Sequence, residues 1–293
     1  MQRQNGHTVA SEWMMIDGSS LIFRAYFGAR SRQMTPGDVV NGIPGFLDRL
    51  ARVIVERRPT RLVVAEDRAW RPAWRVELMP SYKSHRVAEP VPPDLAPQLP
   101  VIRRILEAVG VDVVGVDEYE AEDVIATLAT LAAGSVEILS GDRDLFALVD
   151  GARVRVLYPG RGGYAVIDED EVSRRYGIPG RRYADFAILR GDPSDGLPGL
   201  KGVGSVGAAG LIRRHETVEG VLRDRSLRQA DREYLERAIR VVTPAAELPL
   251  ALPRGRRDRY PADEAGLSSL LAEHDAEEAG TRLSAALQGV LAA

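Results

Sequence analysis

Residues 13–17 (WMMID), 62–67 (LVVAED) and 136–142 (VEILSGD) share one pattern, in which a short apolar run ends in an acidic residue. Such runs are typical of buried strands that stop at a turn. Residues 111–116 (VDVVGV) indicate a further strand. The chain therefore contains at least four short segments with the character of buried β-strands.

Helical patterns separate these predicted strands. They cover residues 45–57, 100–109 and 120–133, and the last has its apolar side chains on one side. Strands that alternate with helices indicate βαβ units and a mainly parallel sheet flanked by helices. The acids follow the strands, at the edge where such sheets bind ligands.

The second part of the chain has a different pattern. Strand signals fade from residue 170, and the centre of this part is the Gly- and Pro-rich stretch 191–210 (GDPSDGLPGLKGVGSVGAAG). We predict a second, helical domain that starts near residue 170. The last forty residues are rich in Ala and Leu and contain RGRRDR at 254–259, which favours packing helices with a solvated linker.

The composition of the 293 residues is that of a soluble globular protein, with 45% hydrophobic and 28% charged residues. No apolar run approaches the roughly 20 residues that a membrane-spanning helix needs, and residues 1–12 lack the features of a signal peptide. We therefore expect a cytoplasmic location. The absence of cysteine excludes disulfides, thiolate catalysis and cysteine zinc sites, and the four histidines are scattered.

The net charge of −3 at first argues against a nucleic-acid partner. However, the charges are segregated, because residues 68–104 contain seven basic residues and only three acids. A basic channel beside an acidic metal pocket would give this total. Of the 39 basic residues only Lys83 and Lys201 are lysines, which suggests positions where a compact ammonium group is required.

The acids at predicted strand ends and helix starts form the candidate site. Uncompensated clustering of so many carboxylates would cost several kcal/mol of mutual repulsion, of the order expected for buried like charges. Hard divalent cations resolve that conflict, and oxygen-only ligation suits magnesium or manganese rather than zinc. The candidates are Asp17, Asp67, Glu120, Glu122, Asp123, Asp142, Asp144, Asp192 and Asp195.

Each acidic motif is weak when taken alone. Residues 120–123 (EAED) fit a helix start that is merely decorated with acids, and residues 141–144 (GDRD) fit an ordinary turn. Their occurrence after successive predicted strands is what favours a shared site.

The order of the motifs resembles that of the 5′-nuclease family, and most closely the 5′→3′ exonuclease domain of bacterial DNA polymerase I and its stand-alone relatives. The resemblance runs from about residue 13 to residue 250. The stretches that carry it are MMIDGSSLIFRAYF (14–27), VVAEDRAWRPAWRVELMPSYKSHR (63–86), YEAEDVIATLA (119–129), VEILSGDRDLF (136–146) and ILRGDPSDGLPGLKGVGSVGAAGLI (188–212).

This resemblance implies an α/β fold with a resolvase-like or PIN-like nuclease core, a helical arch and a C-terminal helix-turn-helix (H3TH) domain. The core would cover residues 13–170 with the arch, or its ordered equivalent, at about 80–105, and the Pro-rich part of the arch would be mobile without DNA. The DNA-binding domain would cover residues 171–250 and a helical extension residues 251–293.

The resemblance also implies roles for single residues. The nine acids above match the family's metal-binding acids, with Asp123 as an additional candidate. Lys83 and Arg86 match the basic pair that meets the scissile phosphate and are the candidate catalytic residues. The implied DNA contacts are Arg24 to a phosphate, Tyr82 stacked on a base, and Lys201, Gly202, Gly204 and Gly207 in the helix-turn-helix element, where the family often holds a potassium ion.

Three positions depart from the family pattern. Glu66 and Asp67 are adjacent, so either could be the acid of the second motif. Glu122 stands where bacterial relatives commonly have Asp, and it still supplies carboxylate oxygens. Arg143 replaces a usual Lys.

The implied activity is that of a 5′→3′ exonuclease and 5′-flap endonuclease in DNA replication and repair, with two Mg²⁺ ions that Mn²⁺ can replace. A DNA polymerase or ligase partner and a monomeric state are also expected. Two alternatives stay open: a non-catalytic, structure-specific DNA-binding protein, and a ribonuclease of the PIN class. The Gly-rich element and the basic segment favour DNA.

Overall fold

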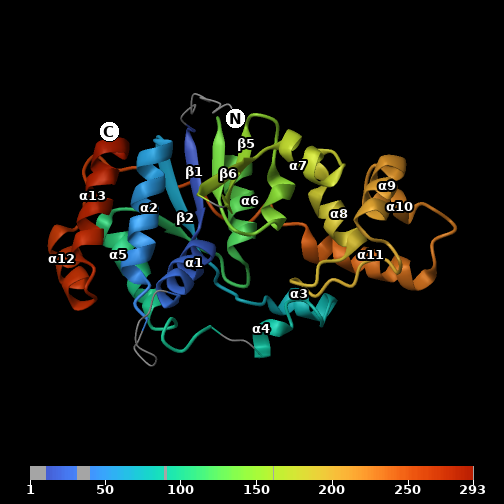
Figure 1. Cartoon of the computed structure of the whole chain (residues 1–293), viewed down its shortest axis with the longest axis horizontal. Coiled ribbons are helices and arrows are strands. Elements are labelled where there is room, and N and C mark those ends of the chain that lie inside the picture. The colour runs from blue at the N-terminus through green and yellow to red at the C-terminus, as the bar shows by residue number, and fades with distance from the viewer. Residues whose placement is uncertain (1–10, 32–39, 89–90, 161, 293) are drawn as a thin grey trace.

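The computed structural model describes residues 11–31, 40–88, 91–160 and 162–292. Its centre is a six-stranded sheet in the order β3-β2-β1-β4-β5-β6, parallel from β3 to β5, with β6 antiparallel to β5 (Figure 1). The predicted α/β class with a mainly parallel sheet is confirmed. The strands are β1 (Trp13–Asp17), β2 (Arg61–Ala65), β3 (Asp112–Val114), β4 (Val136–Leu139), β5 (Val154–Gly160) and β6 (Gly163–Ile167).

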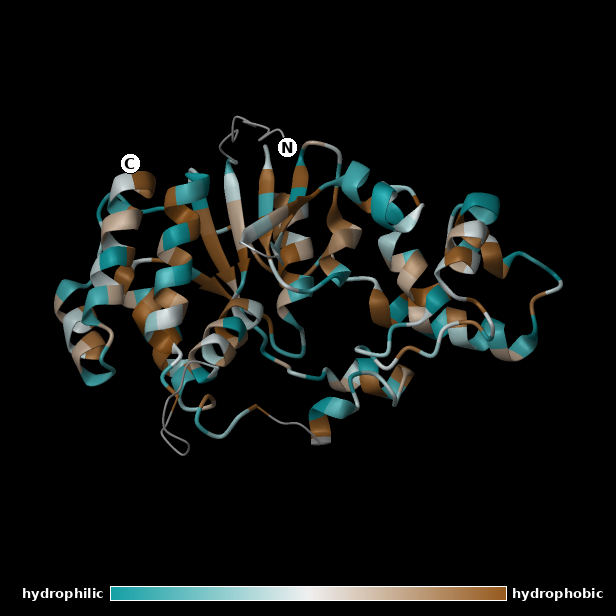
Figure 2. Ribbon diagram, in the orientation of Figure 1, coloured by the Kyte–Doolittle hydropathy of each residue, from teal (hydrophilic) through white to brown (hydrophobic). Residues whose placement is uncertain are grey.

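Helices cover both faces of the sheet because successive side chains of each strand point to opposite faces. Met14 and Ile16 of β1 belong to a core with helices α2, α5, α12 and α13, whereas Met15 belongs to the core on the other face, with α6 and α8. The strands are accordingly apolar along most of their length (Figure 2). The bounds of these helices, and of α1, which follows β1, are α1 (Gly18–Arg30), α2 (Ile43–Arg57), α5 (Gln98–Val109), α6 (Ala121–Leu131), α8 (Tyr183–Arg190), α12 (Glu264–Glu273) and α13 (Glu277–Leu291).

The strand order reverses beside β1. The chain passes from β1 to β2 and β3 on one side and then returns to β4 on the other. In parallel sheets the carboxyl ends of the strands at such a reversal form a crevice in which ligands bind. Asp17 is the last residue of β1, Asp67 follows β2 and Asp142 follows β4, so the topology brings these three acids to one edge.

The second half is helical, with α8 to α11 at one end of the molecule and α12 and α13 at the other end, beside α2 (Figure 1). The described chain from Glu169 onward contains helices and no named strand. In the whole described part of the protein, no helix is long and apolar enough to cross a membrane. The remaining helical elements of this half are α7 (Glu169–Tyr176), α9 (Ser205–His215), α10 (Val218–Leu222), α11 (Gln229–Val242) and the short 3₁₀ turn η2 (Gly180–Arg182). A second 3₁₀ turn, η1 (Asp144–Leu148), belongs to the first half and lies between β4 and β5.

The segment between β2 and α5 holds two short helices, α3 (Ala73–Leu78) and α4 (His85–Ala88). The expected arch at about 80–105 overlaps α5, whose Ile102 and Ile105 are buried in the core. Residues 98–105 are therefore part of a core helix. Residues 89–90 lie outside the described residues, and the expected mobility of the Pro-rich segment stays a prediction.

Candidate active site and metal-binding acids

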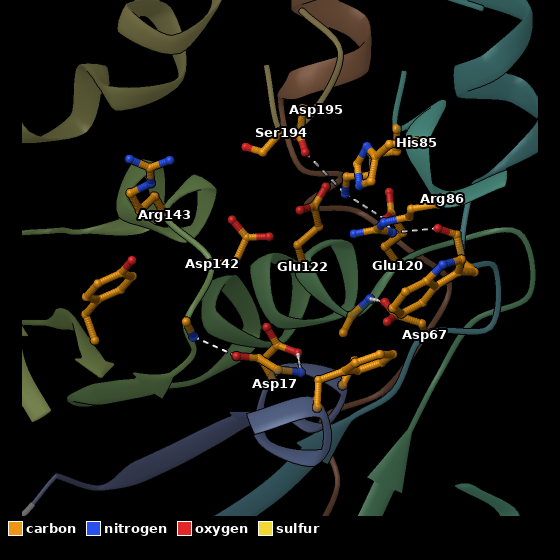
Figure 3. A pocket seen from close by; sticks show the side chains of 18 residues that line it. Asp17, Asp67, His85, Arg86, Glu120, Glu122, Asp142, Arg143, Ser194 and Asp195 are labelled. Carbon is orange, nitrogen blue, oxygen red and sulfur yellow. Dashed lines mark hydrogen bonds and ion pairs between the residues drawn. The ribbon is translucent and has the colours of Figure 1, made fainter. Parts of the chain in front are cut away.

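A pocket of about 410 Å³ opens at the edge of the sheet where β1, β2 and β4 end (Figure 3). Acids from five separate stretches of the chain line it, and they alternate with basic and hydroxyl side chains. The acids at its wall are Asp17, Asp67, Glu120, Glu122, Asp142 and Asp195. The convergence expected from strand ends is therefore present in the folded chain.

Asp17 lies where β1 passes into α1. Its carboxylate accepts the N–H of Ser20 at 3.0 Å and the hydroxyl of Ser140 at 2.5 Å, so it caps α1 and contacts the end of β4. Burial, together with the neighbouring Asp67, raises the pKa of Asp17 to about 7. No cation is among the main influences on this pKa, so the positive charge of the pocket does not offset the burial of Asp17.

Asp67, rather than Glu66, faces the pocket. Its Oδ1 accepts the N–H of Ala121 at 2.7 Å, which ties the end of β2 to the start of α6. Burial raises the pKa of Asp67 above its usual value. Glu66 instead forms ion pairs with Arg68 and Arg103, each at 2.8 Å.

Glu122, Asp142 and Asp144 form the tightest acidic group among the described residues, with one carboxylate oxygen of each within 4.8 Å of the others. Glu122 lies in the first turn of α6, and the two aspartates lie directly after β4. Burial raises the pKa of all three, most strongly for Glu122 and Asp144. Closely spaced carboxyl groups cannot all ionise without repelling one another, and a hard divalent cation bound to their oxygens removes that repulsion.

The loop before α9 supplies Asp192 and Asp195. Asp195 reaches the pocket wall, and its backbone carbonyl accepts the N–H of Lys83 at 3.0 Å. Asp192 is not among the lining residues, because it is paired with Arg190 at 3.1 Å and accepts the N–H of Ser194 at 3.0 Å. Of the two, Asp195 is the one directed at the other acids.

Lys83 and Arg86 meet the acids from the segment that contains α4. The Lys83 ammonium is 2% exposed and donates to Glu120 at 2.8 Å. Burial alone would lower the pKa of Lys83, but Glu122 and Glu120 raise it well above its usual value, so the ammonium stays charged. Arg86 donates to Glu120 at 3.0 Å, and its guanidinium lies 4.3 Å from the centre of the Trp70 ring.

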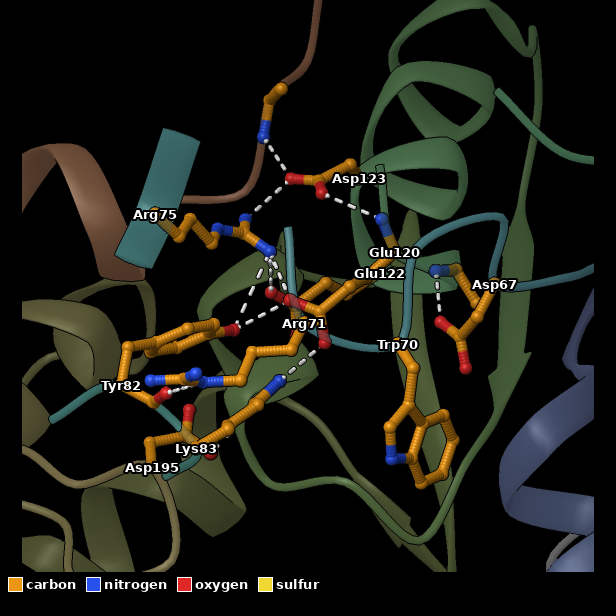
Figure 4. Close-up of polar contacts among 12 residues, drawn as sticks. Asp67, Trp70, Arg71, Arg75, Tyr82, Lys83, Glu120, Glu122, Asp123 and Asp195 are labelled. Carbon is orange, nitrogen blue, oxygen red and sulfur yellow. Dashed lines mark hydrogen bonds and ion pairs between the residues drawn. The ribbon is translucent and has the colours of Figure 1, made fainter. Parts of the chain in front are cut away.

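The structure corrects two expectations about single residues (Figure 4). Tyr82 was expected to stack on a base, but it is 1% exposed and its hydroxyl donates to Glu120 at 2.6 Å. Asp123 was expected as an additional metal ligand, but it is fully buried and lies outside the pocket wall. Its oxygens are used by the N–H groups of Glu120 and Ala245 and by Arg75, so it is a structural acid at the start of α6.

Arg75 is the site residue that the sequence analysis missed. It comes from α3, is fully buried, and pairs with Glu120, Glu122 and Asp123. The Trp74 and Tyr82 rings flank its guanidinium at 4.9 and 5.6 Å. Its position in the basic segment 68–104 indicated a charge near the site, but only the ion pairs of its side chain with the start of α6 reveal it as an internal cation.

The other predicted DNA contacts, apart from the buried Tyr82, lie on the surface. Arg24 is exposed on α1 and lines a neighbouring hollow with Phe23 and Phe27. Lys201, Gly202 and Gly204 are exposed at the turn that leads into α9, and Gly207 is exposed in the first turn of that helix. Gly202 has a φ of +79°, in the left-handed region that favours glycine. Their roles in binding stay predictions.

Comparisons with known proteins identify the family. A family model described as the 5′-3′ exonuclease, N-terminal resolvase-like domain, matches residues 12–177. A 5′-3′ exonuclease of Streptomyces coelicolor is 46% identical over 275 residues, which covers 84% of this chain and 91% of that protein. A 5′-3′ exonuclease of Mycobacterium tuberculosis is 41% identical over 312 residues, which covers 94% of this chain and 98% of that protein.

A similar fold is found among solved structures. The T5 5′-exonuclease with bound divalent zinc ions matches with a TM-score of 0.65 at 15% identity, and the match covers 95% of this chain and 98% of that one. At this identity the likeness concerns the fold alone. It covers both the sheet and the helical half.

Proposed function

This chain belongs to the 5′-3′ exonuclease family, and on that premise we propose that it hydrolyses DNA from 5′ ends and at 5′ flaps with two Mg²⁺ ions, which Mn²⁺ can replace. The observation that carries the proposal is the meeting of Glu122, Asp142 and Asp144 beside the buried Lys83. Carboxylates that can share an ion and a cation that can meet a phosphate are the two parts that phosphodiester hydrolysis needs.

The acids of the pocket other than Glu120 fit divalent cations because their own protein surroundings leave them short of positive charge. Glu122, Asp142, Asp144 and Asp195 would hold the ions, with Asp17 and Asp67 at the rim and Asp192 behind Asp195. Bound ions lower the pKa of water for attack on phosphorus and stabilise the departing 3′ oxygen. The products would carry a 5′ phosphate.

The basic residues have a separate task. Lys83 and Arg86 would bind the scissile phosphate and offset the negative charge that it gains during cleavage. Arg24 would contact a neighbouring phosphate. At the other end of the substrate, Lys201 and the backbone N–H groups around Gly202, Gly204 and Gly207 would bind the duplex. Backbone carbonyl groups of the same segment would hold K⁺.

We extend the proposal to the setting of the enzyme. It acts as a monomer in the cytoplasm during DNA replication and repair, alongside a DNA polymerase or a ligase. The support is the family membership, since its relatives include 5′-3′ exonucleases and the DNA polymerase I of Mycobacterium tuberculosis, to which the chain is 36% identical over 216 residues.

A cleavage assay tests the proposal. The protein is incubated with labelled 5′-flap, nicked, gapped and blunt DNA, with Mg²⁺ or with a chelator, and in parallel with RNA flaps. We expect cleavage of the DNA flap only when Mg²⁺ is present. Binding without cleavage would favour a non-catalytic DNA-binding protein, and preference for the RNA flap would favour a PIN-class ribonuclease.

A further inference from the structure

The carboxylate of Glu120 is surrounded by four donors, of which Arg75, Tyr82 and Lys83 are seen in Figure 4 and Arg86 in Figure 3. Its Oε1 accepts from Lys83 at 2.8 Å and from Arg86 at 3.0 Å, and its Oε2 accepts from Arg75 and, at 2.6 Å, from Tyr82. A carboxylate has about four lone-pair positions for acceptance. Glu120 is 3% exposed, so its acceptor capacity is filled by protein groups.

Glu122, two residues further along, has a different environment. Its one ion pair closer than 3.5 Å in the described chain is with Arg75 at 3.0 Å, and its carboxylate lies within 4.8 Å of oxygens of Asp142 and Asp144. A magnesium ion needs free oxygen lone pairs at about 2.0–2.1 Å. Glu122 can offer one without losing a donor, whereas Glu120 would have to release a donor inside a buried site, which is costly.

The donors around Glu120 come from the segment that carries the candidate catalytic cations. Lys83 has a φ of +44°, a left-handed backbone that non-glycine residues rarely adopt, and it points its buried ammonium at Glu120. Arg86 is held by Glu120, by the carbonyl of Trp70 at 2.6 Å and by the Trp70 ring. Because the long side chains of Lys83 and Arg86 are already held in one geometry, they lose little conformational entropy when substrate binds.

We propose, on the premise of the proposed function, that Glu120 is a positioning residue for Lys83 and Arg86 and does not bind a metal ion directly. The family resemblance implies a metal-ligand role for this acid, and the proposal replaces that role. Glu120 fixes the two cations beside the acids, and Arg75 and Tyr82 in turn fix Glu120. The metal ions are then bound by the group around Glu122, Asp142 and Asp144.

Binding of Mn²⁺ alone tests the first half of this proposal. Mn²⁺ affinity is measured by titration calorimetry for the wild type, for Glu120→Gln and for the matched variant Glu122→Gln, which carries the same change two residues away. We expect Glu120→Gln to stay within about 3-fold of the wild type and Glu122→Gln to bind at least about 10-fold more weakly, as loss of a ligand does. Equal losses in the two variants would overturn the proposal.

A double-mutant cycle tests the second half. If Glu120 acts through Lys83, Glu120→Gln should lower kcat by about 30-fold in the wild type and by less than about 5-fold in a Lys83→Ala background, since residues that act as a unit are non-additive. A full 30-fold loss in both backgrounds would contradict a positioning role. Failure of the wild type to cleave would count against the proposed function and would leave the Mn²⁺ comparison valid.

Glu120→Asp is a more conservative control variant, in case Glu120→Gln does not fold. It keeps the charge but shortens the side chain, so it should retain Mn²⁺ affinity and lose turnover because Lys83 and Arg86 shift. Thermal melting checks that each variant is folded before binding is measured. Weakened Mn²⁺ binding by folded Glu120→Asp, to the level of Glu122→Gln, would also overturn the proposal.

Discussion

Two sides of one pocket differ in how their acids are neutralised. On the cation side, Glu120 is surrounded by Arg75, Lys83 and Arg86. On the acid side, the trio of Glu122, Asp142 and Asp144 shares these cations only in part. Glu120 and Glu122 are both buried, and Asp142 and Asp144 are half-buried. The clearest difference between the two sides is therefore the placement of the fixed cations.

The pKa directions on the two sides follow this difference. Burial alone would raise the pKa of Glu120, but Lys83 and Arg75 outweigh it and hold that pKa below its usual value. Burial raises the pKa of Glu122 well above its usual value, and the same two cations offset only part of the effect. The acid side therefore requires a cation from solution, whereas the cation side already contains its own.

The largest effect is expected on the acid side. Asp142→Asn should lower Mg²⁺-dependent cleavage by about 1,000-fold, since an amide is a poor ligand for a hard cation and the metal supplies much of the charge stabilisation. DNA binding, measured by fluorescence anisotropy in Ca²⁺ or chelator, should change little. Undiminished turnover in this variant would remove Asp142 from the metal site.

Removing a cation should have a smaller effect on turnover. Lys83→Ala should lower kcat by about 100-fold, the range found when one charged donor to a transition state is lost, and should weaken DNA binding by much less. Single-turnover kinetics and equilibrium binding on the same flap substrate separate the two quantities. If both fell equally, Lys83 would be a phosphate anchor only.

The contact between the two halves of the protein should matter next. Gly196 has a φ of +71°, and a Cβ there would lie 1.9 Å from the carbonyl oxygen of Ser81. The two segments are also joined because the Ser81 hydroxyl donates to the Gly196 carbonyl at 2.7 Å. Gly196→Ala should therefore displace the segment that carries Lys83 and lower kcat by about 10-fold, as small misplacements do.

A matched variant separates the clash from backbone strain. Gly151 also has a positive φ, of +50°, but a Cβ there would meet nothing within 4 Å. Gly151→Ala should share the strain of a left-handed alanine and keep wild-type kcat. Equal kcat in the Gly196 and Gly151 variants would show that the contact with Ser81 does not position Lys83.

The smallest effect concerns stability without metal. Because the folded pKa of Asp17 is about 7 against 3.8 in the unfolded chain, the folded state binds more protons between these values. Its contribution to stability is fully present below about pH 4 and is lost as the pH rises to about 7. The Tm of the chelated protein should fall over this window by an amount on the order of 10 °C.

Two comparisons check the cause of this pH dependence. Asp17→Asn should reduce the fall in Tm between pH 4 and 7, since the amide does not titrate. Added Mg²⁺ should reduce it as well, because an ion supplies the missing positive charge. A Tm in chelator that rose over the same window would contradict the raised pKa of Asp17.

Local signals account for what the sequence predicted. Strand ends are visible in the apolar runs, so the positions of Asp17 and Asp142 and the parallel sheet could be inferred without coordinates. The hairpin of β5 and β6 was not predicted, because Arg153, Arg155 and the glycines near residue 162 interrupt its apolar pattern.

What the sequence did not predict depends on packing between distant segments. Tyr82 lies next to Lys83 in a basic stretch, and only the docking of that stretch on α6 buries its ring. Asp123 and its neighbour Glu122 are both acids at the start of the same predicted helix, so the sequence does not distinguish them. In the folded chain Asp123 points toward Arg75 and the backbone N–H of Ala245. Helical spacing alone does not reveal which acid faces the pocket.

The central claim is that the acid side, and not the cation side, binds the divalent ions. Anomalous diffraction from a crystal soaked in Mn²⁺ tests it most directly. We predict a manganese peak coordinated by oxygens of Glu122, Asp142 and Asp144, with Glu120 still bound to Lys83 and Arg86. A peak coordinated by Glu120, or none at the trio, would contradict the account.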